Sequence, residues 1–176
     1  MARGDAVNVG RIASSPHVGT HVDAPWHVDD NGGRVGALPL DAFWGPAWVV
    51  DARGHDRLDV DLFVDLDIAA APRLLVRTQE HTDVRRLETE FPVLTPAAIA
   101  HLAVQGCRLF GVDVCSVDAV DSTTLPVHRA MAAAAIPNVE NLLLDAAPTG
   151  IHMLSALPVS WPDMDAAPLR AVLSTV

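Results

Sequence analysis

The amino-acid sequence predicts a mixed α/β protein that forms one domain over residues 1–176, around a central β core. Half of the residues are hydrophobic and 19% are charged, which suits a packed core and argues against disorder. Short aliphatic segments bounded by Pro, Gly or Asp alternate with helix-like segments in the middle of the chain. Towards both ends the segments are mainly strand-like. We find no internal repeat or linker that would divide the chain.

The strand-like segments are short and rich in Val, Leu and Ile. Residues 6–13 predict one brief strand, and residues 29–41, which are rich in turn residues, predict a surface loop. Residues 56–68 fit either a strand or a short helix. The remaining expected strands are 46–52, 73–78, 108–114, 138–147 and 151–160.

Two segments predict helices. Residues 96–105 follow Thr95, whose hydroxyl can cap the helix; Pro96 suits the first turn and Gly106 provides the end. Residues 126–135 are alanine-rich, which favours a helix, and Pro137 closes the segment.

Composition excludes several classes of function. The net charge of −10 and the absence of a basic cluster argue against nucleic acid as a partner. No run of eighteen apolar residues could span a membrane, and the first residues show no signal-peptide pattern, so we expect no signal peptide. Cys107 and Cys115 show no metal or redox spacing, so we expect reduced core cysteines and a cytoplasmic protein.

Three of the eight histidines fall in one segment with the pattern His17-x3-His21-x-Asp23-x3-His27. Imidazole and carboxylate groups are ligands for zinc and similar ions. Gly19 gives the backbone freedom to turn, and Pro25 stiffens the exit. One Gly and two Pro make this segment a poor helix, so the pattern predicts a loop around a metal. A single histidine is more often a surface or hydrogen-bonded core residue, but this spacing favours a metal site.

The segment "HVGTHVDAPWH" (17–27) resembles the motif H-x-G-T-H-x-D-x-P-x-H of the metal-dependent cyclase-like hydrolases, which include the bacterial kynurenine formamidases and the isatin hydrolases. The resemblance extends from about residue 8 to the end. It implies the family's swivelling β/β/α fold, with the family's first strand and its pocket aromatic lacking here. It also implies that His17, His21 and Asp23 bind metal and that His27 is the catalytic acid and base.

The second half of the chain offers further matches. The family's later histidine and glutamate correspond to His128 and Glu140, which the resemblance implies as metal ligands. Glu140 also interrupts an apolar run, where a buried carboxylate is costly without a cation; the alternative is a strand end that faces water. Residues 111–122 resemble the family segment G-[IV]-D-x-x-S-x-D. Asp113 and Ser116 would then lie near the site and orient its ligands, or else fix a turn.

The resemblance implies the function. We expect hydrolysis of N-formyl-L-kynurenine to L-kynurenine and formate, a step of tryptophan degradation. Two Zn²⁺ ions per subunit would share Asp23, with Mn²⁺ as the alternative, and a water with its pKa lowered to about 7 would attack the formyl carbon. His27 would then protonate the departing nitrogen. Trp26, Phe43 and Trp44 would form an aromatic wall for the substrate, or else pack in the core. Family members imply a homodimer or a larger homo-oligomer.

Three other functions stay open. The nearest is a hydrolase of the same family that opens a cyclic amide such as isatin. A second is a metal-binding relative without catalysis, and a third is a general α/β binding protein whose histidines are incidental. Histidines 55, 81, 101 and 152 lack ligand spacing and are expected to be ordinary surface or core residues.

Overall fold

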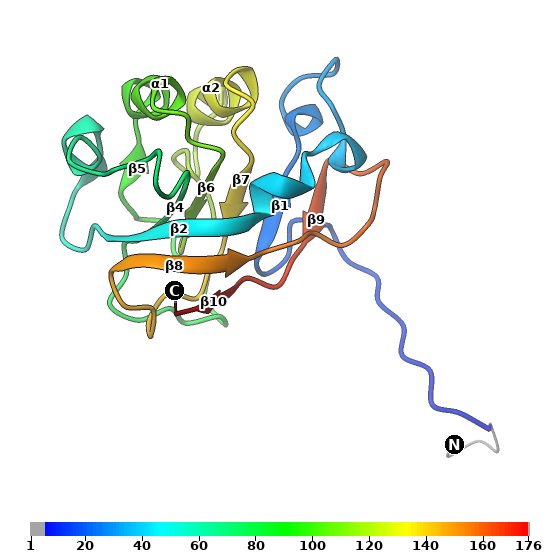
Figure 1. Cartoon of the computed structure of the whole chain (residues 1–176). Coiled ribbons are helices and arrows are strands. Elements are labelled where there is room, and N and C mark those ends of the chain that lie inside the picture. Colours follow the sequence, from blue (N-terminus) through cyan, green and yellow to red (C-terminus); the bar gives the residue numbers. More distant parts are fainter. Residues whose placement is uncertain (1–5, 176) are drawn as a thin grey trace.

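The computed structural model describes residues 6–175, in which an eight-stranded sheet and a two-stranded sheet carry two α-helices (Figure 1). In spatial order the large sheet contains β10 (Val172–Ser174), β8 (Gly150–Ser155), β2 (Trp44–Asp51), β4 (Arg73–Arg77), β6 (Leu109–Val112), β7 (Asn138–Glu140), β1 (His21–Asp23) and β9 (Ala166–Pro168). The small sheet pairs β3 (Arg57–Leu58) with β5 (Val93–Leu94). The helices are α1 (Pro96–Val104) and α2 (Pro126–Ala133), and the 3-10 turns are η1 (Pro25–His27), η2 (Val35–Ala37), η3 (Leu40–Phe43) and η4 (Val60–Leu62).

Strand direction divides the large sheet into a centre and two edges. The central strands β2, β4, β6 and β7 are parallel to one another. The pairs β8–β10 and β1–β9 flank them, and each of these edges joins the centre in antiparallel fashion. Because the helices and short turns connect the parallel strands, the predicted mixed α/β fold is confirmed.

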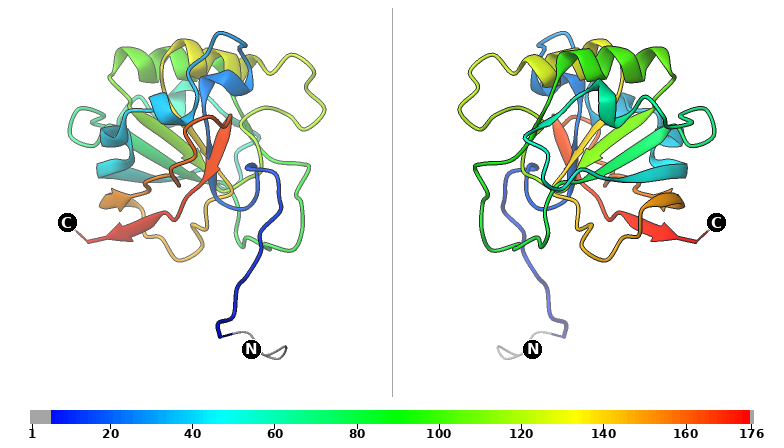
Figure 2. Two further views of the ribbon diagram at one scale, coloured as in Figure 1. Left: turned by 90° about the vertical axis from the view of Figure 1, so that its right-hand side faces the viewer. Right: turned by 90° about the vertical axis from the view of Figure 1, so that its left-hand side faces the viewer.

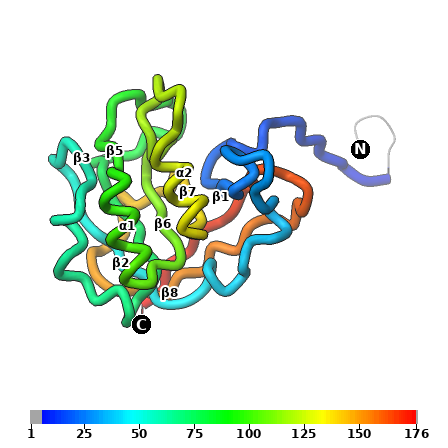
Figure 3. Tube along the Cα trace, turned by 90° about the horizontal axis from the view of Figure 1, so that it is seen from above, coloured from blue at the N-terminus to red at the C-terminus, as the bar shows by residue number. Residues whose placement is uncertain are grey.

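Alternation along the central strands supplies the two faces of the sheet with apolar side chains. On β4, Leu74 and Val76 enter one core cluster, whereas Leu75 enters the other. The first cluster lies between the sheet and the two helices, which run side by side across it (Figure 3). The second cluster receives residues from strands at both edges, including Val22 of β1 and Leu154 of β8, so the sheet curls around it (Figure 2).

Both helices begin where the sequence predicts. The Thr95 hydroxyl accepts a hydrogen bond from Ala98 N at the start of α1, and Pro126 occupies the first turn of α2. These helices are nine and eight residues long, and no helix in residues 6–175 has the length and apolarity required to cross a bilayer. The strands predicted at 46–52, 73–78 and 108–114 are confirmed as β2, β4 and β6.

Other expectations about the elements are wrong or incomplete. Residues 6–13 form no strand; they run as an exposed segment away from the sheet (Figures 1 and 2). The strands at 138–147 and 151–160 end earlier, as β7 and β8, and the sequence analysis missed β9 and β10. The ambiguous 56–68 contains both a strand, β3, and a 3-10 turn, η4. Both cysteines are free, but only Cys107 is buried; Cys115 is partly exposed.

Candidate metal centre

Strand β1 places two of the predicted ligands on one side of the sheet. Side chains alternate along a strand, so His21 and Asp23 share a face, while Val22 between them enters the apolar core. The register with β7 sets His21 opposite Glu140 and Asp23 opposite Asn138. Cross-strand pairing therefore joins donors that lie more than a hundred residues apart. The segment predicted as a loop is a loop only before β1, since β1 and the 3-10 turn η1 form its second half.

Helix α2 adds the third side of the cluster. His128 Nε2 lies 3.4 Å from Asp23 Oδ2 and 3.3 Å from Glu140 Oε1. The other ring nitrogen, Nδ1, lies 2.7 Å from Asp118 Oδ2. Asp118 also accepts hydrogen bonds from the backbone N–H groups of Val127 and His128, in the first turn of α2. One buried carboxylate thus fixes both the helix start and the ring of His128.

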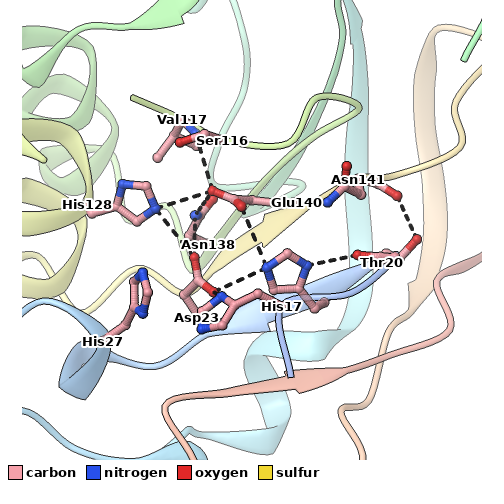
Figure 4. A network of polar contacts seen from close by, with 12 residues as sticks. His17, Thr20, Asp23, His27, Ser116, Val117, His128, Asn138, Glu140 and Asn141 are labelled. Atoms are coloured by element: carbon pink, nitrogen blue, oxygen red, sulfur yellow. Dashed lines mark hydrogen bonds and ion pairs between the residues drawn. The ribbon is translucent and has the colours of Figure 1, made fainter. Parts of the chain in front are cut away.

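The segment around β1 closes the cluster from the opposite side (Figure 4). His17 Nδ1 lies 3.0 Å from Asp23 Oδ1, and its Nε2 lies 2.9 Å from Asp165 Oδ2. His27, the last residue of η1, has its Nδ1 3.2 Å from the same Asp165 oxygen. Gly19 between the two motif histidines has φ +62°, a conformation that favours glycine.

The donors form two groups that could each hold a cation, and Asp23 belongs to both. His17, Asp23 and His27 form one group, and His21, Asp23 and Glu140 form the other; in each, the ligand atoms lie within 4.8 Å of one another. His21 Nε2 and Asp23 Oδ1 are buried and have no hydrogen-bond partner among the described residues. Burying such atoms unpaired is costly. The residues present therefore fit a divalent metal between these atoms.

Electrostatics within the cluster point the same way. Burial alone would raise the pKa of Asp23, but close contacts with the His128, His17 and His21 rings outweigh it and hold that pKa well below its usual value. The contact with Asp23 raises the pKa of His17 to about 9. Burial lowers the pKa of His128, yet contacts with Asp23 and Glu140 dominate and raise it to about 10. The carboxylates thus attract positive charge, from protons or from metal.

Glu140 does not face water. Its side chain is buried and accepts hydrogen bonds from Asn138 Nδ2 at 2.8 Å and from Val117 N at 3.3 Å. The alternative of a solvent-facing strand end is therefore wrong. The other oxygen, Oε2, lies 3.6 Å from His21 Nε2.

The two residues expected to orient the ligands lie in different surroundings. Asp113 bonds to Thr78 and Gln79, and no hydrogen bond or ion pair within residues 6–175 joins it to the donor cluster. Its carboxylate fixes the chain after β4, and these hydrogen bonds give no support to a role in orienting ligands. Ser116 lies beside the cluster, where its hydroxyl accepts a hydrogen bond from Asp118 N at 3.2 Å.

The predicted aromatic wall is not assembled. Phe43 is fully buried in the second core cluster, and Trp44 is exposed at the start of β2. Trp26 lines an outer depression next to His27, with the Arg34 guanidinium carbon 3.4 Å from its ring centroid. For Phe43 the alternative of core packing is correct. The sequence around Phe43 does not indicate whether its side chain faces the core or a substrate.

A different set of residues forms a cavity beside the cluster. Its volume is about 150 Å³, and Asp23, His27 and His128 belong to its lining. The remaining wall is largely apolar and comes from the end of α2 and from the segment around η2; it includes Leu38, Pro39, Met131, Ala135 and Ile136.

Three residues of the site escaped the sequence analysis. Asp118 lies in the same 111–122 segment as Ser116, so its motif position was a usable signal. Asn138 donates from Nδ2 to both Asp23 and Glu140, at 3.1 and 2.8 Å. Asp165 precedes β9 in a segment without a recognisable pattern, and only pairing of β9 with β1 brings it to His17 and His27.

Comparison with known proteins agrees with this geometry. Residues 5–119 match the model of the Cyclase family. A kynurenine formamidase from Paracidovorax citrulli (strain AAC00-1) is 41% identical over 174 residues, which cover 96% of this chain and 81% of that protein.

Two solved structures share the fold. One, described as a potential metal-dependent hydrolase with cyclase activity, superposes with a TM-score of 0.84 at 29% identity, over 93% of this chain and 81% of that one. Isatin hydrolase A from Labrenzia aggregata, bound to benzyl benzoate, superposes with a TM-score of 0.80 at 27% identity, over 98% of this chain and 78% of that one. The motif, the fold and these similarities lead to one conclusion: the chain belongs to the Cyclase family of metal-dependent hydrolases.

Proposed function

We propose that the protein is a metal-dependent amidohydrolase that cleaves aryl formamides, with N-formyl-L-kynurenine as substrate and L-kynurenine and formate as products. The observation that carries this proposal is the pair of donor groups that share the buried Asp23, one of which includes His27, next to an apolar cavity. The 41% identity to a kynurenine formamidase supports the choice of substrate.

In this proposal His17, His21, Asp23, His128 and Glu140 hold two Zn²⁺ ions, with Mn²⁺ as the alternative. Such ions polarise an amide carbonyl and lower the pKa of water, which supplies a nucleophile at neutral pH. Asp23 suits a shared ligand because its two oxygens face different histidines, with Oδ1 towards His17 and Oδ2 towards His128. Asn138 and the backbone of Val117 hold Glu140 in place.

His27 would move the proton. With Nδ1 donating to Asp165 Oδ2, the other nitrogen, Nε2, is left to take a proton from the attacking water and then to give it to the departing arylamine. Asp165 also holds His17, so one carboxylate orients a ligand and the proton carrier together. The His27 side chain is 30% exposed and lines the cavity, as a group that meets substrate must.

The test is metal content and N-formylkynurenine turnover in wild type, in His27→Ala and in His55→Ala, an exposed histidine used as the control. We expect both variants to retain wild-type metal. Turnover should fall about 100- to 10,000-fold in His27→Ala, the usual size of acid–base assistance, and stay unchanged in His55→Ala. Loss of metal from His27→Ala would show that His27 is a metal ligand. Full activity of His27→Ala would show that His27 has no part in the mechanism.

A cyclic amide is the second candidate substrate, because isatin hydrolase A shares the fold at 27% identity. Turnover of N-formylkynurenine and of isatin by the same preparation separates the two. Turnover of neither, with metal bound, would favour a metal-binding relative without catalysis.

We also propose that residues 1–176 form a single domain, that two such chains form a homodimer, and that the protein works in the cytoplasm. The free cysteines support the reducing compartment. Light scattering at several protein concentrations tests the dimer.

A further inference from the structure

The cavity beside the donor cluster is lined by acidic, basic and apolar side chains. Its lining includes Asp23 and His27, the cationic side chain of Arg34, and apolar side chains such as Met131 and Ile136. An engineered apolar cavity of about 150 Å³ holds one benzene molecule. The volume here, about 150 Å³, is therefore sufficient for a single aromatic ring.

Arg34 is held in place by two contacts. Its guanidinium carbon stacks 3.4 Å from the ring centroid of Trp26, and one nitrogen, Nη1, donates to the backbone oxygen of Asp163 at 2.5 Å. Within residues 6–175, no carboxylate side chain forms an ion pair with Arg34. A guanidinium carries five N–H groups in a planar fork, so an oriented donor face remains for an anion.

The charge around the site makes this arginine selective. The chain carries a net charge of −10. A substrate with a free carboxylate is repelled by such surroundings unless a cation faces it. Among the described residues Arg34 is the one arginine that lines the cavity, and arginine binds carboxylates through two parallel hydrogen bonds.

We propose that this cavity is a binding site for aryl amides that carry a carboxylate: the apolar wall holds the ring, the scissile amide lies at the Asp23 and His27 end, and Arg34 binds the carboxylate. This inference rests on the proposed function and adds to it the residue that sets specificity. It assigns to Met131 and Ile136, rather than to Phe43 or Trp44, the contact with the ring. Trp26 acts through Arg34, as the surface on which the guanidinium is positioned.

The experiment compares two substrates that differ only in the carboxylate, N-formyl-L-kynurenine and N-formylkynuramine. Wild type, Arg34→Gln, Arg34→Lys and a control, Arg57→Gln, are assayed with both. Arg57 is an exposed arginine of β3, on the other side of the molecule from β1 (Figure 3), so its loss changes the net charge equally without touching the cavity.

For Arg34→Gln we expect kcat/KM for the acidic substrate to fall about 10- to 100-fold, the usual range for one charge-assisted pair, with less than about a 3-fold change for the substrate without the carboxylate. Arg34→Lys should recover only part of the loss, because an ammonium lacks the planar fork. Arg57→Gln should match wild type. Equal losses for both substrates, or none for either, would overturn the assignment of Arg34.

Binding of the products separates this inference from the proposed function. L-kynurenine and kynuramine are titrated calorimetrically into the metal-loaded proteins. If wild type binds L-kynurenine more tightly than kynuramine, and Arg34→Gln loses this difference, the carboxylate site is supported. This holds even if the protein turns over no formamide, because absence of turnover would contradict only the proposed reaction. Equal binding of the two products to wild type would overturn the site itself.

Discussion

Two buried aspartates show how differently this fold uses the same side chain. Asp23 and Asp113 are 7% and 3% exposed. Both oxygens of Asp113 accept hydrogen bonds from Thr78 or Gln79, whereas Asp23 Oδ1 has no hydrogen-bond partner in residues 6–175 and faces histidine rings.

The two carboxyl groups also differ in pKa. Burial raises the pKa of Asp113 despite its hydrogen bonds from Thr78 and Gln79. For Asp23 the three histidines outweigh burial, and its pKa is lowered. Burial of a carboxylate therefore does not identify a ligand. A ligand is identified by an unpaired oxygen and by neighbours that can bind the same cation.

The largest effect should follow removal of the shared ligand. Asp23→Asn is expected to lose both metals and to lower turnover about 1,000-fold or more, because metal contact supplies several kcal/mol of transition-state stabilisation. Elemental analysis and the formamidase assay measure this. A variant that kept its metal and most of its activity would place the cation elsewhere.

Asp118→Asn tests a carboxylate that contacts the ring nitrogen Nδ1 of the proposed ligand His128. The charge that orients His128 is lost while the shape is kept, and metal affinity should fall about 10- to 100-fold, as is usual for such partners. Competition with a chelator gives the dissociation constant. If only the melting temperature fell, with metal affinity intact, the role of Asp118 would be confined to the start of α2.

Asp113→Asn provides the matched contrast. The amide cannot accept all the hydrogen bonds from Thr78 and Gln79, so the free energy of unfolding should fall by about 1–3 kcal/mol. Metal content should not change, since the hydrogen bonds of the Asp113 carboxylate within residues 6–175 go to Thr78 and Gln79 and not to the cluster. Urea unfolding and elemental analysis test both halves of this prediction. Metal loss in Asp113→Asn would contradict the conclusion that Asp23 and Asp113 have different roles.

The smallest effect concerns pH. In the metal-free protein the pKa values of His17 and His128 are raised to about 9 and about 10, against about 6.5 for an unfolded histidine. Their contribution to stability is therefore complete below about pH 6.5 and is lost as the pH rises through 9 to 10. Bound metal replaces the protons. The melting temperature of chelator-treated protein should fall over this range more than that of metal-loaded protein, and equal slopes would contradict this linkage.

Short-range patterns along the chain were sufficient to predict both helices and the central strands β2, β4 and β6. Thr95, Pro96 and Gly106 define α1 because capping and backbone preferences act within a few residues. The 17–27 motif and its family resemblance indicated His17, His21 and Asp23 as donors, and the same resemblance located His128 and Glu140.

Which groups meet depends instead on the pairing of distant segments. The register of β1 on β7 sets His21 opposite Glu140, and pairing of β9 with β1 brings Asp165 to His27. Residues 6–13 have a strand-like pattern but form no strand, and Phe43 packs in the core rather than against a substrate. In each case the outcome depends on contacts between segments far apart in the chain, which packing of the whole core selects and local spacing cannot encode.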